Sequence, residues 1–173
     1  MRLADNASYR FVRRLDVNDL TDAVLTLSEQ VWQGAFRRKT DMHPLNQDVD
    51  SIVIRHGVTA GSPIYRNTEA YAMIREPLEG VLKQLPGADR VRLARLHAGK
   101  HIPLHIDQAP YFEVQHRLHI PLTTNPAVYF VVQDEVKCLA VGEVWEINNI
   151  VPHEVRNYGN SDRIHMVVDY YDI

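Results

Sequence analysis

The sequence predicts a mainly β protein in which N-terminal α-helices pack outside an antiparallel barrel or sandwich of the jelly-roll type. Two observations support this. Before residue 90, apolar residues recur at helical spacing. After it, short β-rich segments follow one another between Gly, Pro and Asn, without helices between them. These eight segments are 91–97, 102–107, 115–123, 127–133, 135–140, 143–148, 151–157 and 163–170.

The N-terminal half predicts two helices and one strand. Asp19 is a suitable N-cap for a helix that runs to about Phe36, and residues 51–56 have the composition of a strand. A second helix begins at Thr68 and runs to about Leu85. Pro77 must kink or split it, because proline lacks the amide hydrogen that a helix interior uses.

Length and composition indicate one compact domain. The chain has 173 residues, 45% of them apolar, without repeats or linkers. We therefore expect a single domain over 1–173, with a helical and lid-forming part at 1–89 and a barrel core at 90–173. The net charge of -3 gives no basic excess, so neither nucleic acid nor an anionic membrane is an expected partner.

The expected location is the cytoplasm. The longest wholly apolar run, residues 127–132, is far shorter than the roughly 18 residues of a membrane span, and no secretion signal is visible. One cysteine excludes an internal disulfide framework and fits a reducing compartment.

A candidate metal site lies in the C-terminal half. His105 and Asp107 are two residues apart in a predicted strand, so their side chains share one face. His153, in another predicted strand, offers a third ligand. Two imidazoles and one carboxylate form the facial triad that suits non-haem Fe(II) and oxygen chemistry. The alternative for the first pair is a hydrogen-bonded surface pair.

A zinc site at His97, His101 and His105 is the other arrangement considered. Their spacing of four would align them on a helix, but Gly99 and Pro103 break any helix there. His97 and His101 are therefore expected to be barrel or loop residues.

Two arginines are candidate anion-binding residues. Arg163 lies in a strand with apolar residues on both faces, where a cation needs an anionic partner. Arg117 and His119 share one face of another strand. The alternatives are that Arg163 pairs with a structural acid, Asp169 or Glu143, and that Arg117 lies on the barrel rim.

Together these motifs resemble the aspartyl/asparaginyl β-hydroxylase family of 2-oxoglutarate-dependent oxygenases, to which bacterial free-proline hydroxylases are related. The resemblance covers roughly residues 91–170. It rests on His105-x-Asp107, Arg117-Leu-His119, Gly142-Glu-Val-Trp145, Asn148-Asn149, His153-x-Val-x-Asn157 and Arg163-Ile-His-Met-Val-Val-Asp169. Before residue 90 it is faint and limited to residues 52–57.

The resemblance implies a double-stranded β-helix, or cupin-like barrel, that binds Fe(II), 2-oxoglutarate and O2. In this sequence the implied metal ligands are His105, Asp107 and His153. Arg163 is the implied partner of the distal carboxylate of 2-oxoglutarate. The implied co-substrate pocket also includes Arg117 and His119, Arg117 contacting either co-substrate or substrate. Ala94 stands where some relatives carry a hydroxyl.

The expected function is hydroxylation of a C–H bond in an amino acid, free or within a peptide, with release of succinate and CO2. Two alternatives remain: a non-catalytic cupin-type protein that uses a metal to bind a small acid, and a metal-assisted isomerase or hydrolase. For the substrate, Arg117 and Arg95 are candidates to hold a carboxylate at the pocket mouth. The loop from about Thr40 to Arg66 is the expected lid.

Overall fold

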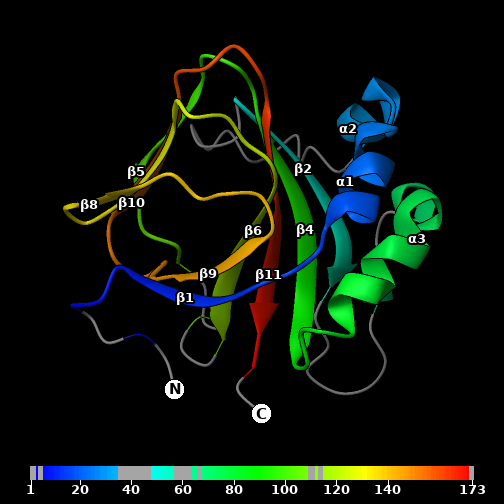
Figure 1. Cartoon of the computed structure of the whole chain (residues 1–173), viewed down its shortest axis with the longest axis horizontal. Helices are drawn as coiled ribbons and strands as arrows, with labels where there is room; N and C mark the ends of the chain where they lie inside the picture. Colours follow the sequence, from blue (N-terminus) through cyan, green and yellow to red (C-terminus); the bar gives the residue numbers. More distant parts are fainter. Residues whose placement is uncertain are drawn as a thin grey trace.

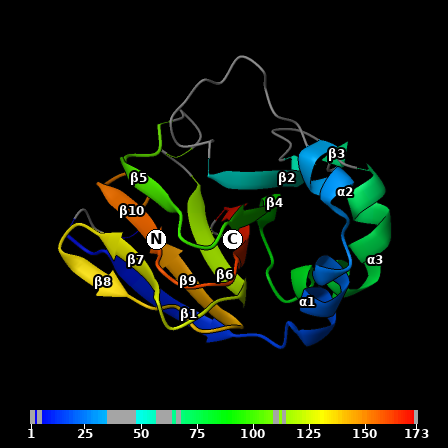
Figure 2. The same ribbon diagram turned by 90° about the horizontal axis from the view of Figure 1, so that it is seen from above.

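The computed structural model describes residues 3, 6–34, 48–56, 64–65, 68–108, 112 and 115–171. Two antiparallel sheets face one another, and three helices pack on the outer side of the larger sheet (Figures 1 and 2). This confirms the mainly β, jelly-roll architecture with flanking N-terminal helices. None of the helices in the described ranges is long and apolar enough to cross a membrane.

The larger sheet has seven strands in the order β1-β9-β6-β11-β4-β2-β3. Their bounds are β1 (Tyr9–Arg14), β9 (Glu143–Ile147), β6 (His116–Thr123), β11 (Arg163–Tyr170), β4 (Ala88–Leu96), β2 (Val49–His56) and β3 (Ile64–Tyr65). The smaller sheet has the order β5-β10-β7-β8. It contains β5 (His101–His105), β10 (His153–Asn157), β7 (Val128–Val132) and β8 (Glu135–Lys137).

The first predicted helix is two helices, α1 (Asn18–Leu25) and α2 (Glu29–Gly34). Local hydrogen bonds separate them: the Thr26 hydroxyl donates to the carbonyl of Ala23, and the amide of Val31 donates to the Ser28 hydroxyl. Such side-chain bonds compete with a continuous helix. The N-cap position of α1 belongs to Val17, not to Asp19. The remainder of the predicted helix, to Phe36, lies outside the described residues.

The second predicted helix, α3 (Thr68–Leu82), is one element with Pro77 inside it. It therefore is not split, and it ends three residues before Leu85. Its buried side chains pack with those of α1 and the outer face of the large sheet, in what we call the outer core. The sequence did not predict β1 or β3; β1 pairs with β9 and extends the large sheet.

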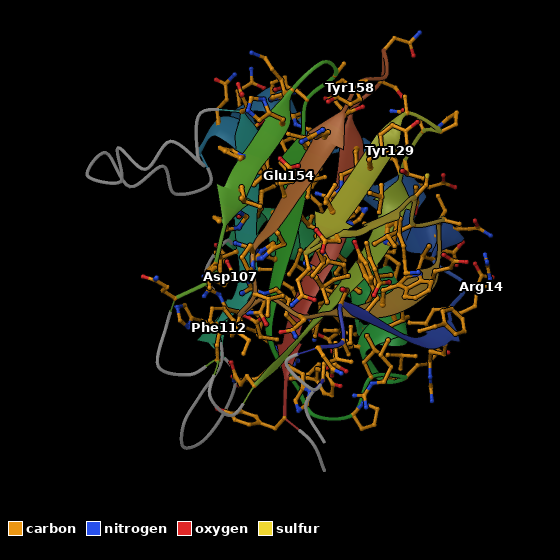
Figure 3. The ribbon with its side chains drawn as sticks, turned by 90° about the vertical axis from the view of Figure 1, so that its left-hand side faces the viewer. Arg14, Asp107, Phe112, Tyr129, Glu154 and Tyr158 are labelled. Atoms are coloured by element: carbon orange, nitrogen blue, oxygen red, sulfur yellow. The ribbon has the colours of Figure 1, made fainter. Side chains whose placement is uncertain are left out.

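A second cluster, the inner core, fills the space between the sheets and includes Leu96, Phe130 and Val155. Alternation along each strand separates the two environments. In β11, Ile164, Met166 and Val168 join the outer core, which leaves Arg163 and His165 on the inner face. Figure 3 shows the outer surface of the small sheet, which faces away from the inner core. Tyr129 of β7, Glu154 of β10 and Tyr158, which follows β10, lie on this side.

Gly142 closes the turn before β9 in a conformation that favours glycine. Its φ is 77°, and an added Cβ would lie 2.5 Å from the carbonyl oxygen of Leu15. The amide of Leu15 in turn donates to the Gly142 carbonyl, at 2.8 Å.

We expect Gly142→Ala to lower the free energy of unfolding by about 2 kcal/mol or more, because both the backbone strain and the clash oppose the folded state. Gly99→Ala is the matched control: Gly99 also has a positive φ of 70°, but nothing lies within 4 Å of its added Cβ. Urea denaturation measures both. Equal losses in the two variants would show that the Leu15 contact adds nothing.

Candidate metal centre

His105 and His153 lie opposite one another on neighbouring strands. β5 and β10 are antiparallel, and these two residues are Cα partners at the end of the ladder. Their ring centroids are 4.1 Å apart. Glu154 and Arg156 alternate away from His153, whereas Val155 is buried. The predicted parity of this strand is therefore confirmed.

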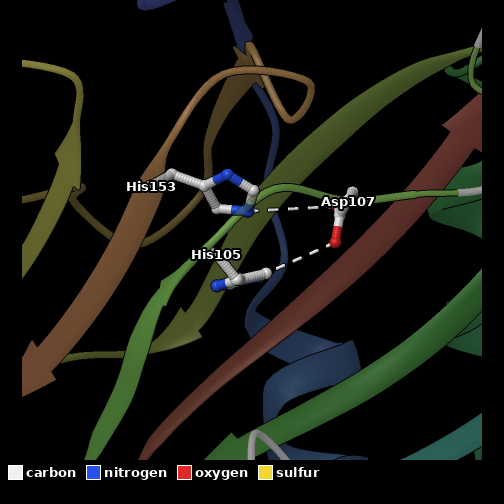
Figure 4. Close-up of side chains that lie close together, drawn as sticks. All are labelled: His105, Asp107 and His153. Carbon is white, nitrogen blue, oxygen red and sulfur yellow. Dashed lines mark ion pairs between the residues drawn. The ribbon is translucent and has the colours of Figure 1, made fainter.

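Asp107 reaches the same point from outside the strand. The sequence places it in one strand with His105, but β5 ends at His105. Its backbone amide instead donates to the carbonyl of Asn149, at 2.9 Å. The carboxylate then lies 3.6 Å from Nε2 of His105 and 4.0 Å from Nε2 of His153 (Figure 4). One potential ligand atom from each residue lies within 4.8 Å of the others.

Backbone carbonyls orient both imidazoles. Nδ1 of His105 lies 2.8 Å from the carbonyl oxygen of Pro103, and Nδ1 of His153 lies 2.9 Å from that of Val151. A carbonyl only accepts, so this network assigns the proton to Nδ1 and leaves the lone pair of each Nε2 facing the centre. Ligating histidines characteristically have such partners on the distal nitrogen.

Arg117 and Asn149 support the carboxylate. Nη1 of Arg117 and Nδ2 of Asn149 both donate to Oδ2 of Asp107, which leaves Oδ1 toward His105. Asp169 anchors Arg117 through two bonds of 2.7 and 2.9 Å. Burial raises the pKa of Asp107, but the charge of Arg117 and then that of His153 outweigh it, so the pKa falls below its usual value.

Arg117 is therefore buried within the barrel, not on its rim. Three of its five N–H groups are committed to Asp107 and Asp169.

Arg163 is buried to 1% exposure without an acidic partner among the described residues. Its Nη2 lies 2.6 Å from Nδ1 of His165, while its Nε has no hydrogen-bond partner. The expected structural acids are engaged elsewhere: Asp169 with Arg117, and Glu143 with Arg14. Burial, with the nearby charge of Arg92, lowers the pKa of Arg163 to about 9, so it is a cation at neutral pH.

His119 and His165 add neutral polar groups to the same inner face. Burial, followed by the charge of Arg163, holds the pKa of each well below its usual value. Their ring centroids are 5.7 Å apart, and within the described ranges Nδ1 of His119 and Nε2 of His165 have no hydrogen-bond partner. The face therefore offers both a cation and uncommitted hydrogen-bonding groups.

The expectation for Arg95 is wrong. It lies on the opposite face of β4, where it binds Glu29 and Asp50, each at 2.6 Å, and stacks 4.6 Å from the ring of Trp32. Paired in this way beside α2, it does not reach the barrel interior. The predicted lid, Thr40–Arg66, falls largely outside the described residues.

Sequence reasoning assigned no role to Arg92 or to Asn149, and it did not predict that Asp169 pairs with Arg117. The alternation Arg90-Val-Arg92-Leu in β4 was the available signal for Arg92.

A surface hollow of about 640 Å³ between α1 and α3, lined in part by Asp16, Asp19 and Glu76, lies on the helical side, away from the triad.

Two imidazoles and one carboxylate that converge inside a jelly-roll barrel form the donor set typical of the non-haem Fe(II) oxygenases. The sequence model of the aspartyl/asparaginyl β-hydroxylase family matches residues 61–172. The chain belongs to that family and is a 2-oxoglutarate-dependent hydroxylase.

Solved structures support the fold. The chain is similar to an oxidoreductase of the 2OG-Fe(II) oxygenase family from Burkholderia pseudomallei, with 20% identity, coverage of 71% of this chain and 67% of the other, and a TM-score of 0.51. It is also similar to a prolyl hydroxylase from Trichoplax adhaerens in complex with a hypoxia inducible factor peptide, with 12% identity, coverage of 97% and 85%, and a TM-score of 0.57. No curated protein matches the sequence.

Proposed function

We propose that His105, Asp107 and His153 bind Fe(II), and that Arg163 binds the distal carboxylate of 2-oxoglutarate. One observation carries the proposal: three ligand atoms of the correct types converge in a barrel whose inner face also carries a buried arginine that has no acidic partner in the described part of the chain. Two imidazole nitrogens and one carboxylate oxygen suit Fe(II) and leave positions for co-substrate and oxygen.

When bound, the iron and 2-oxoglutarate supply the oxidant that hydroxylates a C–H bond, with release of succinate and CO2. The chain's own groups position the reactants. Pro103 and Val151 fix the two imidazoles, and Arg117 and Asn149 hold one oxygen of Asp107. Arg163 selects a dicarboxylic co-substrate because its planar fork matches a carboxylate. Arg117 and His119 line the co-substrate pocket.

The proposed substrate is an amino acid, free or within a short peptide. The family takes its name from Asp and Asn, whose side chains are small and polar, and the proposal extends this to the substrate of the present chain. The isomerase or hydrolase is less well supported, because it does not require the buried cation at Arg163. The cupin-type binding protein differs in that it would form no succinate coupled to oxidation of a substrate.

The test is a mass-spectrometric screen with Fe(II), 2-oxoglutarate and O2. Free amino acids, with proline among them, and short peptides containing Asp or Asn are incubated with the protein. We expect a gain of one oxygen in the substrate and an equal amount of succinate. Turnover without O2 would identify an isomerase or hydrolase. Oxidation of only a nucleobase, lipid or sugar would contradict the substrate class and leave the metal assignment intact.

A further inference from the structure

Arg92 is a third arginine of the barrel interior, beside Arg117 and Arg163. In β4, Val91 and Leu93 belong to the outer core and Leu96 to the inner core, so alternation places Arg92 on the inner face. Its cross-strand partner is Val167 in β11, which is itself opposite His119 in β6. Arg92 thus lies on the same face as Arg163 and one strand away from it.

The surroundings of Arg92 are cationic. Burial, followed by the charge of Arg117, lowers the pKa of Arg92 to about 10, although Asp169 and Asp107 partly offset the shift. Both carboxylates are already bound to Arg117. Arg92 forms no ion pair with any described residue, and its buried Nε has no hydrogen-bond partner.

The charges of this interior cluster favour an additional anion. Three guanidinium groups (Arg92, Arg117, Arg163) face two carboxylates, those of Asp107 and Asp169. A divalent metal raises the excess of positive charge to three, and dianionic 2-oxoglutarate lowers it to one. One more negative charge would make the interior neutral, and a buried charge is costly unless it is paired.

We propose that Arg92 binds a carboxylate of the prime substrate. The proposal rests on the function proposed above, in which Arg163 binds the distal carboxylate of the co-substrate. Arg92 is then the interior cation that still has no anionic partner among the described residues. It restricts the substrate to molecules that carry an anionic group.

An unpaired cation among like charges has a consequence for the empty protein. Removing it relieves repulsion, whereas removing a structural cation would break a contact. We expect Arg92→Met to melt at the same temperature as the wild type, or higher, when no ligand is present. Arg156→Met is the matched control: it removes an exposed arginine of β10 that pairs with Glu154.

The binding experiment follows the melting temperature under anaerobic conditions with Mn²⁺ and 2-oxoglutarate present. The probes are the amino acids of the screen, L-proline and L-aspartate among them, each compared with its α-amide, which lacks the charge. We expect an acid to stabilise the wild type and Arg156→Met, and the amide to bind about thirtyfold more weakly or worse. In Arg92→Met the acid and the amide should behave alike, and Arg92→Lys should restore part of the difference.

Three results would overturn the proposal. In one, no acid stabilises the wild type more than its amide does. In another, Arg92→Met still discriminates between them. In the third, Arg92→Met weakens 2-oxoglutarate and leaves the acid unaffected, which would assign Arg92 to the co-substrate. Because melting does not require turnover, these results differ from failure of the proposed function, in which the wild type forms no succinate.

Discussion

Replacing His153 with alanine is expected to abolish hydroxylation and metal binding together. Its Nε2 faces Asp107 and its Nδ1 is held by the carbonyl of Val151. Among the described residues only His105 and Asp107 form a potential metal-ligand group with it, so the substitution removes one of the three proposed ligands. Iron content by elemental analysis and succinate formation measure the two losses in one preparation.

His101→Ala is the matched control, because His101 is an exposed histidine at the opposite end of β5. It should retain wild-type metal content and activity, which also tests the alternative zinc site. Full activity in His153→Ala would remove the assignment of the triad. Asp107→Ala should keep part of its iron, since two imidazoles remain, but lose hydroxylation.

The barrel strands could be predicted from the sequence because their composition and punctuation are local properties. Each predicted strand of the second half is present, with bounds that differ by a few residues. β1 was missed because its side chains are mostly exposed and mix Arg with apolar residues, so the strand depends on pairing with β9. The break between α1 and α2 was missed because it depends on hydroxyl bonds of Thr26 and Ser28.

The site was predictable as far as spacing could determine it. Two-residue parity predicted that His105 and Asp107 lie together, and they do, but for another reason: β5 ends at His105, and the bond of the Asp107 amide to the Asn149 carbonyl places the carboxylate. What the sequence could not show is which partner each cation has. Arg92 and Arg95 must lie on opposite faces of their strand because they are three residues apart. Which of them faces inward depends on the rest of the fold: α2 brings Glu29 to Arg95, and the pairing of β4 with β11 places Arg92 on the inner face.

Asp169 shows the same limit. It lies on the same face of β11 as Arg163, and the sequence therefore offered it as the acid for that arginine. The register of β11 with β6 instead places Asp169 opposite Arg117. This pairing leaves Arg163 without an acidic partner among the residues that the structure describes.

Replacing Arg163 with alanine is expected to raise the apparent 2-oxoglutarate constant by roughly thirtyfold to several thousandfold, or to abolish turnover. The loss of a buried, charge-assisted pair costs on the order of 2–5 kcal/mol, and each 1.4 kcal/mol corresponds to about tenfold in binding. Titration of 2-oxoglutarate against succinate formation, and against melting temperature with Mn²⁺ present, measures the change with and without turnover.

Arg163→Lys should recover only part of this binding, because an ammonium group cannot present two parallel N–H donors to one carboxylate. It also cannot make the contact with His165 and bind the co-substrate with the same planar fork. An unchanged 2-oxoglutarate constant in Arg163→Ala would instead make Arg163 a structural cation. Iron content should stay at the wild-type level in both variants, since Arg163 contacts none of the three metal ligands in the described structure, and this separates loss of the co-substrate from loss of the metal.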